Sequence, residues 1–122
     1  MLDGKRVVVV DDSIVRGSTS GPIVSLLRRS GAREVHLRIC SPPIRHACYF
    51  GVDMARRDEL IGARLDVDAI CAQVGADSLG YLSLEGMVAA TGASYGELCT
   101  ACFTGDYPIP VQLELSKDAL EV

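Results

Sequence analysis

Two adjacent carboxylates and a short run of small, hydroxyl-bearing residues lie close together near the start of this 122-residue chain. The acids are Asp11 and Asp12, and the run that follows contains Gly17, Ser18 and Thr19. Backbone N–H groups and hydroxyls that converge at the start of a helix suit a phosphate group. Carboxylates repel a phosphate unless they contact something else, which ribose hydroxyls or a divalent cation would supply. The pattern therefore predicts a site for a phosphorylated sugar, with its ring over the acids and its phosphate in the loop.

Arginine side chains near this segment are harder to interpret. Arg16 lies inside the loop, where its guanidinium group is either a phosphate ligand or a solvated loop charge, and the residues favour neither. The pair Arg28 and Arg29 is interpreted as the solvated end of a helix.

Cysteine is the second residue type that could do chemistry here. Cys99 and Cys102 form a C-x-x-C pair, a spacing that lets two thiolates share one metal or cluster. Cys48 lies in a proline-flanked loop with no periodic reason for burial. We interpret Cys40 and Cys71 as buried small hydrophobes, because the first ends an alternating strand and the second lies on the apolar face of a helix. An odd total of five cysteines favours a metal, a cluster or plain burial over a disulfide framework.

Composition predicts one soluble domain. A chain of 122 residues is long enough for a single core but too short for two. Its formal net charge of -4 gives no support for nucleic-acid binding. No apolar stretch approaches the roughly 20 residues that span a bilayer, and the first residues have no signal-peptide core. We therefore expect a cytoplasmic protein without a membrane partner.

The acids and the loop need a strand before them and a helix after them. Residues 7–10 are consecutive valines, a run typical of a strand buried on both faces of a parallel sheet. The acids would then lie at its carboxyl end, where open α/β sheets bind ligands. Apolar spacing over 23–27, with Gly31 as the stop, predicts a helix. Alternation over 34–40 predicts a second strand, reached by a right-handed crossover.

The second half of the chain contains weaker patterns. Residues 58–63 could form a short helix, and a clearer helix begins at the N-cap Asp66 and ends at Gly75. A brief extended segment at 81–82 precedes a helix over 83–92. Beyond this point the periodicity fails.

The segment 7–19 resembles the phosphoribosyl-pyrophosphate (PRPP) motif of type I phosphoribosyltransferases, and in particular that of the glutamine PRPP amidotransferase family. Three further segments carry the likeness in the family's order: residues 41–53, 75–86 and 99–108. Two departures are Ser18, where the family pattern has threonine, and Ala47, where it has proline. The resemblance covers nearly the whole chain.

This resemblance implies a partial, Rossmann-like α/β fold, in which a parallel sheet with helices is followed by a mostly helical region. Residues 1–40 would form the PRPP-motif βαβ unit, and residues 41–122 the helical, cysteine-containing region of the same domain. Family members also carry an N-terminal glutaminase domain and a pyrophosphate loop. We expect this chain to be the C-terminal part of such an enzyme, inactive alone, with the glutaminase part as its partner.

The activity implied by the resemblance is the formation of 5-phosphoribosylamine from PRPP and glutamine-derived ammonia, in the first step of purine biosynthesis. Asp11 and Asp12 would hold the ribose hydroxyls or Mg²⁺ and face the developing cation. The 5'-phosphate of PRPP, or of a nucleoside monophosphate, would be anchored by Ser13, Arg16, Gly17, Ser18 and Thr19.

The resemblance also implies a 4Fe-4S cluster, which one subset of the family carries. Its ligands here would be Cys48, Cys99 and Cys102, with a fourth ligand from outside this chain. Without the rest of the transferase domain, the strand over 7–10 should present an apolar edge. We therefore expect a homo-oligomer.

Two alternatives come from other classes of protein. The first is a receiver-type signalling domain, because a strand that ends in an acid pair can also bind Mg²⁺. The second is a structural iron-sulfur or zinc module in which Asp11 and Asp12 have no catalytic part. A metal assay beside a PRPP-binding assay would separate the second from the main interpretation.

Overall fold

Strands and helices follow one another in the alternating order that builds α/β folds. The computed structural model describes residues 1–50 and 57–109. One parallel sheet has the order β1-β2-β3, formed by β1 (Arg6–Asp11), β2 (Glu34–Ile39) and β3 (Ser78–Tyr81). The helices described are α1 (Ser20–Arg29), α2 (Ile61–Arg64), α3 (Val67–Val74), α4 (Leu84–Thr91) and α5 (Ala101–Thr104), with short 3-10 helices η1 (Arg57–Glu59) and η2 (Tyr95–Glu97).

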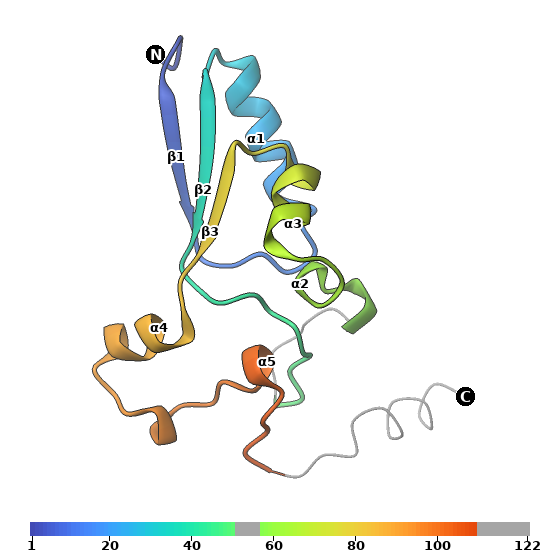
Figure 1. The fold of residues 1–122 in the computed structure, drawn as a ribbon, viewed down its shortest axis with the longest axis vertical. Helices are drawn as coiled ribbons and strands as arrows, with labels where there is room; N and C mark the ends of the chain where they lie inside the picture. Colours follow the sequence, from blue (N-terminus) through green and yellow to red (C-terminus); the bar gives the residue numbers. More distant parts are fainter. Residues whose placement is uncertain (51–56, 110–122) are drawn as a thin grey trace.

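Helices α1 and α3 cover one face of the sheet, as Figure 1 shows. The central strand β2 supplies Val35, Leu37 and Ile39 to that face, and all three are buried. They pack with Val24 of α1 and Ile70 of α3 in the main apolar core. The α/β class expected from the sequence is therefore observed, and the crossover from β1 through α1 to β2 joins parallel neighbours.

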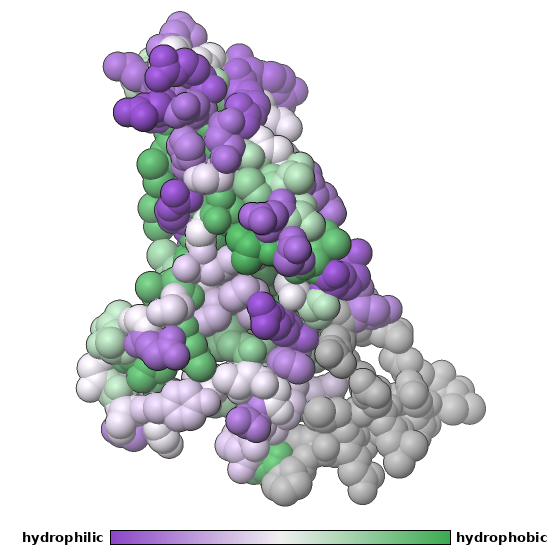
Figure 2. All heavy atoms as spheres, in the orientation of Figure 1, coloured by the Kyte–Doolittle hydropathy of each residue, from purple (hydrophilic) through white to green (hydrophobic). Residues whose placement is uncertain are grey.

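Strand β1 does not have the burial expected of it. Val7 and Val9 pack against the core, whereas Val8 and Val10 are 61% and 67% exposed. The prediction of burial on both faces is therefore wrong for the described part of the chain, because α1 and α3 cover one face of the sheet and no described element covers the other face, where Val8 and Val10 lie. The apolar edge expected from the missing neighbours is present, and Figure 2 shows apolar side chains along this side of the molecule.

Local capping signals place the helix ends correctly. The Asp66 side chain accepts a hydrogen bond from the N–H of Ala69 at 2.8 Å, and α3 ends at Gly75 with φ of 81°. Ser83 accepts from the N–H of Gly86 at 3.0 Å at the start of α4. These bonds satisfy N–H groups that have no partner inside the helix.

Four other predictions need correction. Residues 58–63 are divided between η1 and α2 and do not form one helix, and β3 begins before the expected segment 81–82. Cys40 is exposed, because β2 ends one residue earlier and Cys40 lies in the following bend. Cys71 is only partly buried, and this burial raises the pKa of its thiol.

Arg28 is exposed in the last turn of α1, as expected, but it also has partners that the sequence did not predict. Its Nη2 donates to the carbonyl oxygen of Gly75 at 2.6 Å and to the carboxylate of Asp77 at 2.9 Å. Asp77 also accepts from the N–H of Val35 at 2.7 Å. The hydrogen bonds from Val35 and then from Arg28 lower the pKa of Asp77. These bonds join α1 to the end of α3 and to the central strand.

No helix within residues 1–50 and 57–109 is long and apolar enough to cross a bilayer.

We expect Arg28→Ala to lower the free energy of unfolding by about 1 kcal/mol, because it removes charge-assisted hydrogen bonds at a partly exposed position. Arg29→Ala is the matched control, since Arg29 is exposed in the same turn, and its effect should stay below about 0.5 kcal/mol. Urea unfolding followed by circular dichroism measures both. Equal destabilisation by the two variants would contradict the role assigned to Arg28.

Candidate functional site

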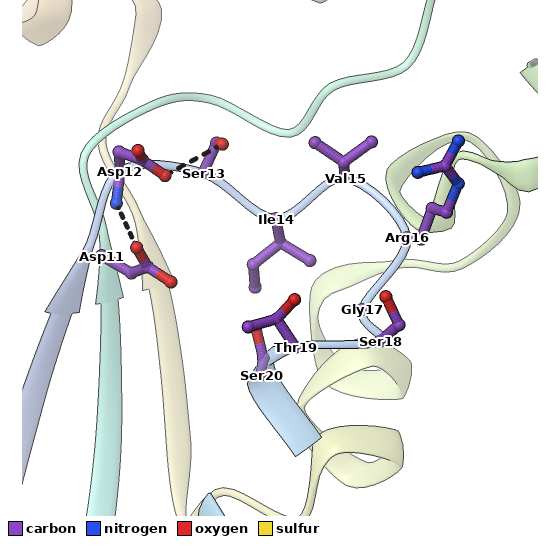
Figure 3. A pocket seen from close by; sticks show the side chains of 10 residues that line it. All are labelled: Asp11, Asp12, Ser13, Ile14, Val15, Arg16, Gly17, Ser18, Thr19 and Ser20. Carbon is purple, nitrogen blue, oxygen red and sulfur yellow. Dashed lines mark hydrogen bonds between the residues drawn. The ribbon is translucent and has the colours of Figure 1, made fainter. Parts of the chain in front are cut away.

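A pocket of about 270 Å³ lies at the carboxyl end of β1, where the chain turns into α1. Its lining is continuous in sequence: Asp11, Asp12, Ser13, Ile14, Val15, Arg16, Gly17, Ser18, Thr19 and Ser20. Figure 3 shows the acids at the end of the strand and the small hydroxyl residues at the start of the helix. The structure therefore brings all seven residues that the sequence predicted for the sugar phosphate into one pocket.

The acid pair keeps most of its hydrogen-bonding capacity. Asp11 accepts from the N–H of Asp12 at 2.8 Å, and Asp12 accepts from the hydroxyl of Ser13 at 3.2 Å. Among the described residues, no lysine, arginine or histidine pairs with either carboxylate. An ionised carboxylate accepts several hydrogen bonds or binds a hard cation, so both acids have oxygens available to a ligand.

Contacts with buried residues set the shape of the loop at residues 13–19. Ile14 is 3% exposed and belongs to the main core, and the carbonyl oxygen of Val15 accepts from the N–H of Ile61 at 3.0 Å. Gly17 has φ of +80°, and a Cβ built there would lie 2.9 Å from Cδ1 of Ile61. Only glycine adopts this conformation freely, and Ile61 is fully buried and has little room to move.

The start of α1 leaves hydrogen-bond donors without partners. Thr19 is the N-cap but makes no side-chain capping bond, and Pro22 in the first turn has no N–H. Within the part of the chain that the structure describes, the N–H groups and hydroxyls of the segment 17–19 donate to no protein acceptor. Such donors, together with the positive end of the helix dipole, favour an anion.

Arg16 has a partner that neither interpretation of the sequence included. Its Nε lies 3.1 Å from Oε2 of Glu59, and the two side chains are 54% and 46% exposed. Glu59 and Ile61 are therefore residues of this site that sequence reasoning missed. The only local signal was a short helix over 58–63, which did not indicate that this segment packs on the loop.

Of the three candidate cluster cysteines, Cys102 lies beside the loop that precedes Cys48. The N–H groups of Arg45 and His46 donate to the carbonyl oxygen of Cys102 at 2.9 and 3.0 Å, which joins the loop before Cys48 to α5. Burial raises the pKa of the Cys102 thiol, and the nearby thiols of Cys48 and Cys99 raise it further.

These cysteines nevertheless do not form a complete metal site. Cys99 is exposed and Cys48 is half-buried, with its sulfur 3.4 Å from the N–H of Phe50. Across residues 1–50 and 57–109, no group of three or more histidine, cysteine, aspartate or glutamate side chains is arranged to hold a metal ion. The structure therefore fits the predicted cluster ligands only in part.

Curated relatives of this chain are amidophosphoribosyltransferases. The enzyme of Synechococcus elongatus is 50% identical over 120 residues, which is 98% of this chain and 24% of the relative. The enzyme of Bacillus subtilis is 49% identical over 115 residues, or 91% of this chain and 24% of the relative. The chain thus spans about a quarter of the length of the relatives it matches. No protein-family model matches the chain.

Solved structures give the same result for the fold. Glutamine PRPP amidotransferase from B. subtilis, complexed with ADP and GMP, matches with a TM-score of 0.86 and 47% identity over 93% of this chain and 26% of that protein. A structure described as the allosteric regulatory enzyme of purine biosynthesis matches with a TM-score of 0.86 and 49% identity over 93% of this chain and 25% of that one. The resemblance and the fold expected from the sequence are therefore confirmed.

Proposed function

We propose that this chain holds the ribose 5-phosphate part of PRPP in an amidophosphoribosyltransferase. Nearly the whole chain is homologous to about a quarter of the length of such enzymes. The complete enzyme would form 5-phosphoribosylamine from PRPP and glutamine-derived ammonia, in the first step of purine biosynthesis. This proposal rests on one observation: the same pocket has carboxylate oxygens available to a ligand at one end, and N–H and hydroxyl donors without protein acceptors at the other.

The loop would bind the 5'-phosphate through its backbone and its hydroxyls. Donors from Gly17, Ser18 and Thr19 are held in place before the ligand arrives, so little ordering entropy is lost on binding. The hydroxyl of Ser13 lies beside the acids and would reach the ribose or the phosphate. Serine in place of the family threonine at position 18 keeps the hydroxyl donor.

Asp11 and Asp12 would face the ribose ring. Their carboxylates can accept hydrogen bonds from the ribose hydroxyls and stabilise the positive charge that develops at C1 as pyrophosphate leaves. Mg²⁺ is commonly bound by one or two carboxylates together with substrate phosphates, so this acid pair fits it. When bound, the metal would neutralise charge on the departing pyrophosphate. The residues of this chain would thus act by position and charge, without a protein nucleophile.

Other functions of the complete enzyme would come from residues outside this chain. We place the PRPP-motif unit in residues 1–40 and the remainder of the same domain in residues 41–122. The glutaminase part and the groups that hold pyrophosphate would belong to the other three quarters of the relatives' length. This chain by itself should therefore have no amidotransferase activity.

A nucleoside monophosphate is the second candidate ligand of the same loop. It carries the ribose 5-phosphate group that the pocket would recognise. The B. subtilis neighbour was solved with GMP, which belongs to this chemical class. The receiver-type alternative is weaker, because it gives no role to the unpaired donors of the loop.

For the cysteines, we propose a 4Fe-4S cluster that Cys48, Cys99 and Cys102 ligate together with one residue from outside the chain. The hydrogen bonds that join the loop before Cys48 to Cys102 support this assignment. Within the described residues these thiols do not form a group of three arranged to hold a metal, so the site would have to close when the fourth ligand and the cluster bind.

We also propose that the exposed valines of β1 drive self-association of this chain. Parallel sheets are usually covered on both faces, and an exposed apolar face favours packing against another chain. Light scattering should give the mass of at least two chains, and replacing both Val8 and Val10 by threonine should shift the population toward monomer. Leu26→Ala is the control, since Leu26 is 56% exposed on α1. A monomeric unsubstituted chain would disprove the proposal.

Calorimetric titration with ribose 5-phosphate should show weak binding by this chain, with a dissociation constant on the order of 1 mM. Gly17→Val should weaken it at least about tenfold, because the new side chain would collide with Ile61 and disfavour the left-handed backbone. Gly96→Val is the matched control, since its Cβ would meet nothing within 4 Å. Ribose without the phosphate should not bind measurably. Equal affinity of the unsubstituted chain and Gly17→Val would refute the assignment of the loop.

Anaerobic reconstitution with iron and sulfide should give this chain less than one cluster per molecule, because only three thiolates are at hand. An added small thiol should raise the iron content by supplying the fourth ligand. Cys99→Ser should abolish that gain, whereas Cys40→Ser, a change at an exposed cysteine outside the trio, should not. Iron analysis and absorption spectra measure this, and a full cluster without added thiol would contradict it.

A further inference from the structure

Arg16 is the only cationic side chain that lines the pocket at the end of β1. In the structure its Nε donates to Oε2 of Glu59 at 3.1 Å. Figure 3 shows Arg16 and the acid pair at opposite ends of the loop, with the arginine side chain extending away from Asp11 and Asp12. The one positive charge of the phosphate pocket is therefore paired with a carboxylate that is not part of the pocket lining.

Glu59 is held beside the loop by the residues that follow it. Leu60 and Ile61 are both fully buried, and the N–H of Ile61 donates to the carbonyl oxygen of Val15 at 3.0 Å. Ile61 also packs against Gly17, so two contacts fix this segment on the loop. The position of the Glu59 carboxylate next to Arg16 is consequently built into the fold and does not depend on a flexible side chain alone.

We propose that Glu59 competes with the phosphate of the ligand for Arg16, and so sets how tightly the loop binds phosphorylated sugars. This inference rests on the proposed function of the pocket. An ion pair between half-exposed side chains is weak, so an entering phosphate can displace it. A phosphate also presents more charge and can bind both edges of the guanidinium fork, of which Glu59 occupies only Nε.

The competition has a defined consequence for binding. Glu59→Gln removes the charge that holds Arg16 and that repels the phosphate, so ribose 5-phosphate should bind about three- to tenfold tighter. In an Arg16→Ala background the same substitution should have a much smaller effect, because no guanidinium remains to be released. Unphosphorylated ribose should show no measurable binding to any of these variants.

The experiment is a double-mutant cycle by calorimetry on the 122-residue chain, at one fixed ionic strength. The variants are Glu59→Gln, Arg16→Ala and the double substitution, each titrated with ribose 5-phosphate and with ribose. Glu85→Gln, at an exposed site in α4, is the control for the change in net charge and should leave affinity unchanged. Circular dichroism checks that each variant folds. Glu59→Asp, which keeps the charge but withdraws the carboxylate by one methylene, should give part of the gain.

Each outcome has a distinct meaning. Weaker binding by Glu59→Gln would show that Glu59 orients Arg16 for the phosphate, and would overturn the competition. If Glu59→Gln raised the affinity for ribose 5-phosphate equally with and without Arg16, Glu59 would only repel the phosphate. That result would also overturn the competition. Absence of any ribose 5-phosphate binding, in the unsubstituted chain and in every variant, would instead overturn the proposed function and this inference with it.

Discussion

The fit of Ile61 beneath the loop at residues 13–19 is the contact on which the candidate site depends. Its N–H holds the carbonyl oxygen of Val15, and its Cδ1 fills the space beside Gly17 that any larger residue would need. Because protein interiors are close-packed, this contact leaves the loop little freedom to collapse onto its own donors. The donors at the start of α1 therefore remain available to an anion in the absence of one.

The same part of the structure joins the two candidate sites. Ile44 and Leu60 form a small buried cluster, against which Val15 of the loop and Cys102 of α5 both pack. Gly62 brings α2 close to this cluster, since a Cβ at this position would lie 2.8 Å from the carbonyl oxygen of Ile44. The loop at residues 13–19 and Cys102 are therefore neighbours in one packed unit.

The open face of the sheet supports the proposal that this unit works as part of a longer enzyme. Its helices cover one face only, and the outer face of β1 carries exposed valines. All-parallel sheets occur almost only with both faces covered, because their strands are apolar on both sides. Relatives about four times as long supply ample chain for such a cover, and a second copy of this chain is the alternative proposed above.

The sequence by itself determined the features that act over a few residues. The caps Asp66 and Ser83 were predictable because a side chain meets an N–H one turn later, and the pocket lining was predictable because its residues are consecutive. The resemblance over nearly the whole chain also predicted the fold that the solved structures share. Prediction was less successful where burial depends on where an element ends, as at Cys40.

Only the tertiary structure decided which groups meet across long stretches of chain. Arg16 finds Glu59 at a separation of 43 residues, and Arg28 finds the carbonyl oxygen of Gly75 at a separation of 47. It also decided that β1 lies at the edge of the described sheet, although a run of four valines is typical of a central strand. A local pattern records which side chains avoid water but not which neighbour covers them, because that depends on how the whole chain packs.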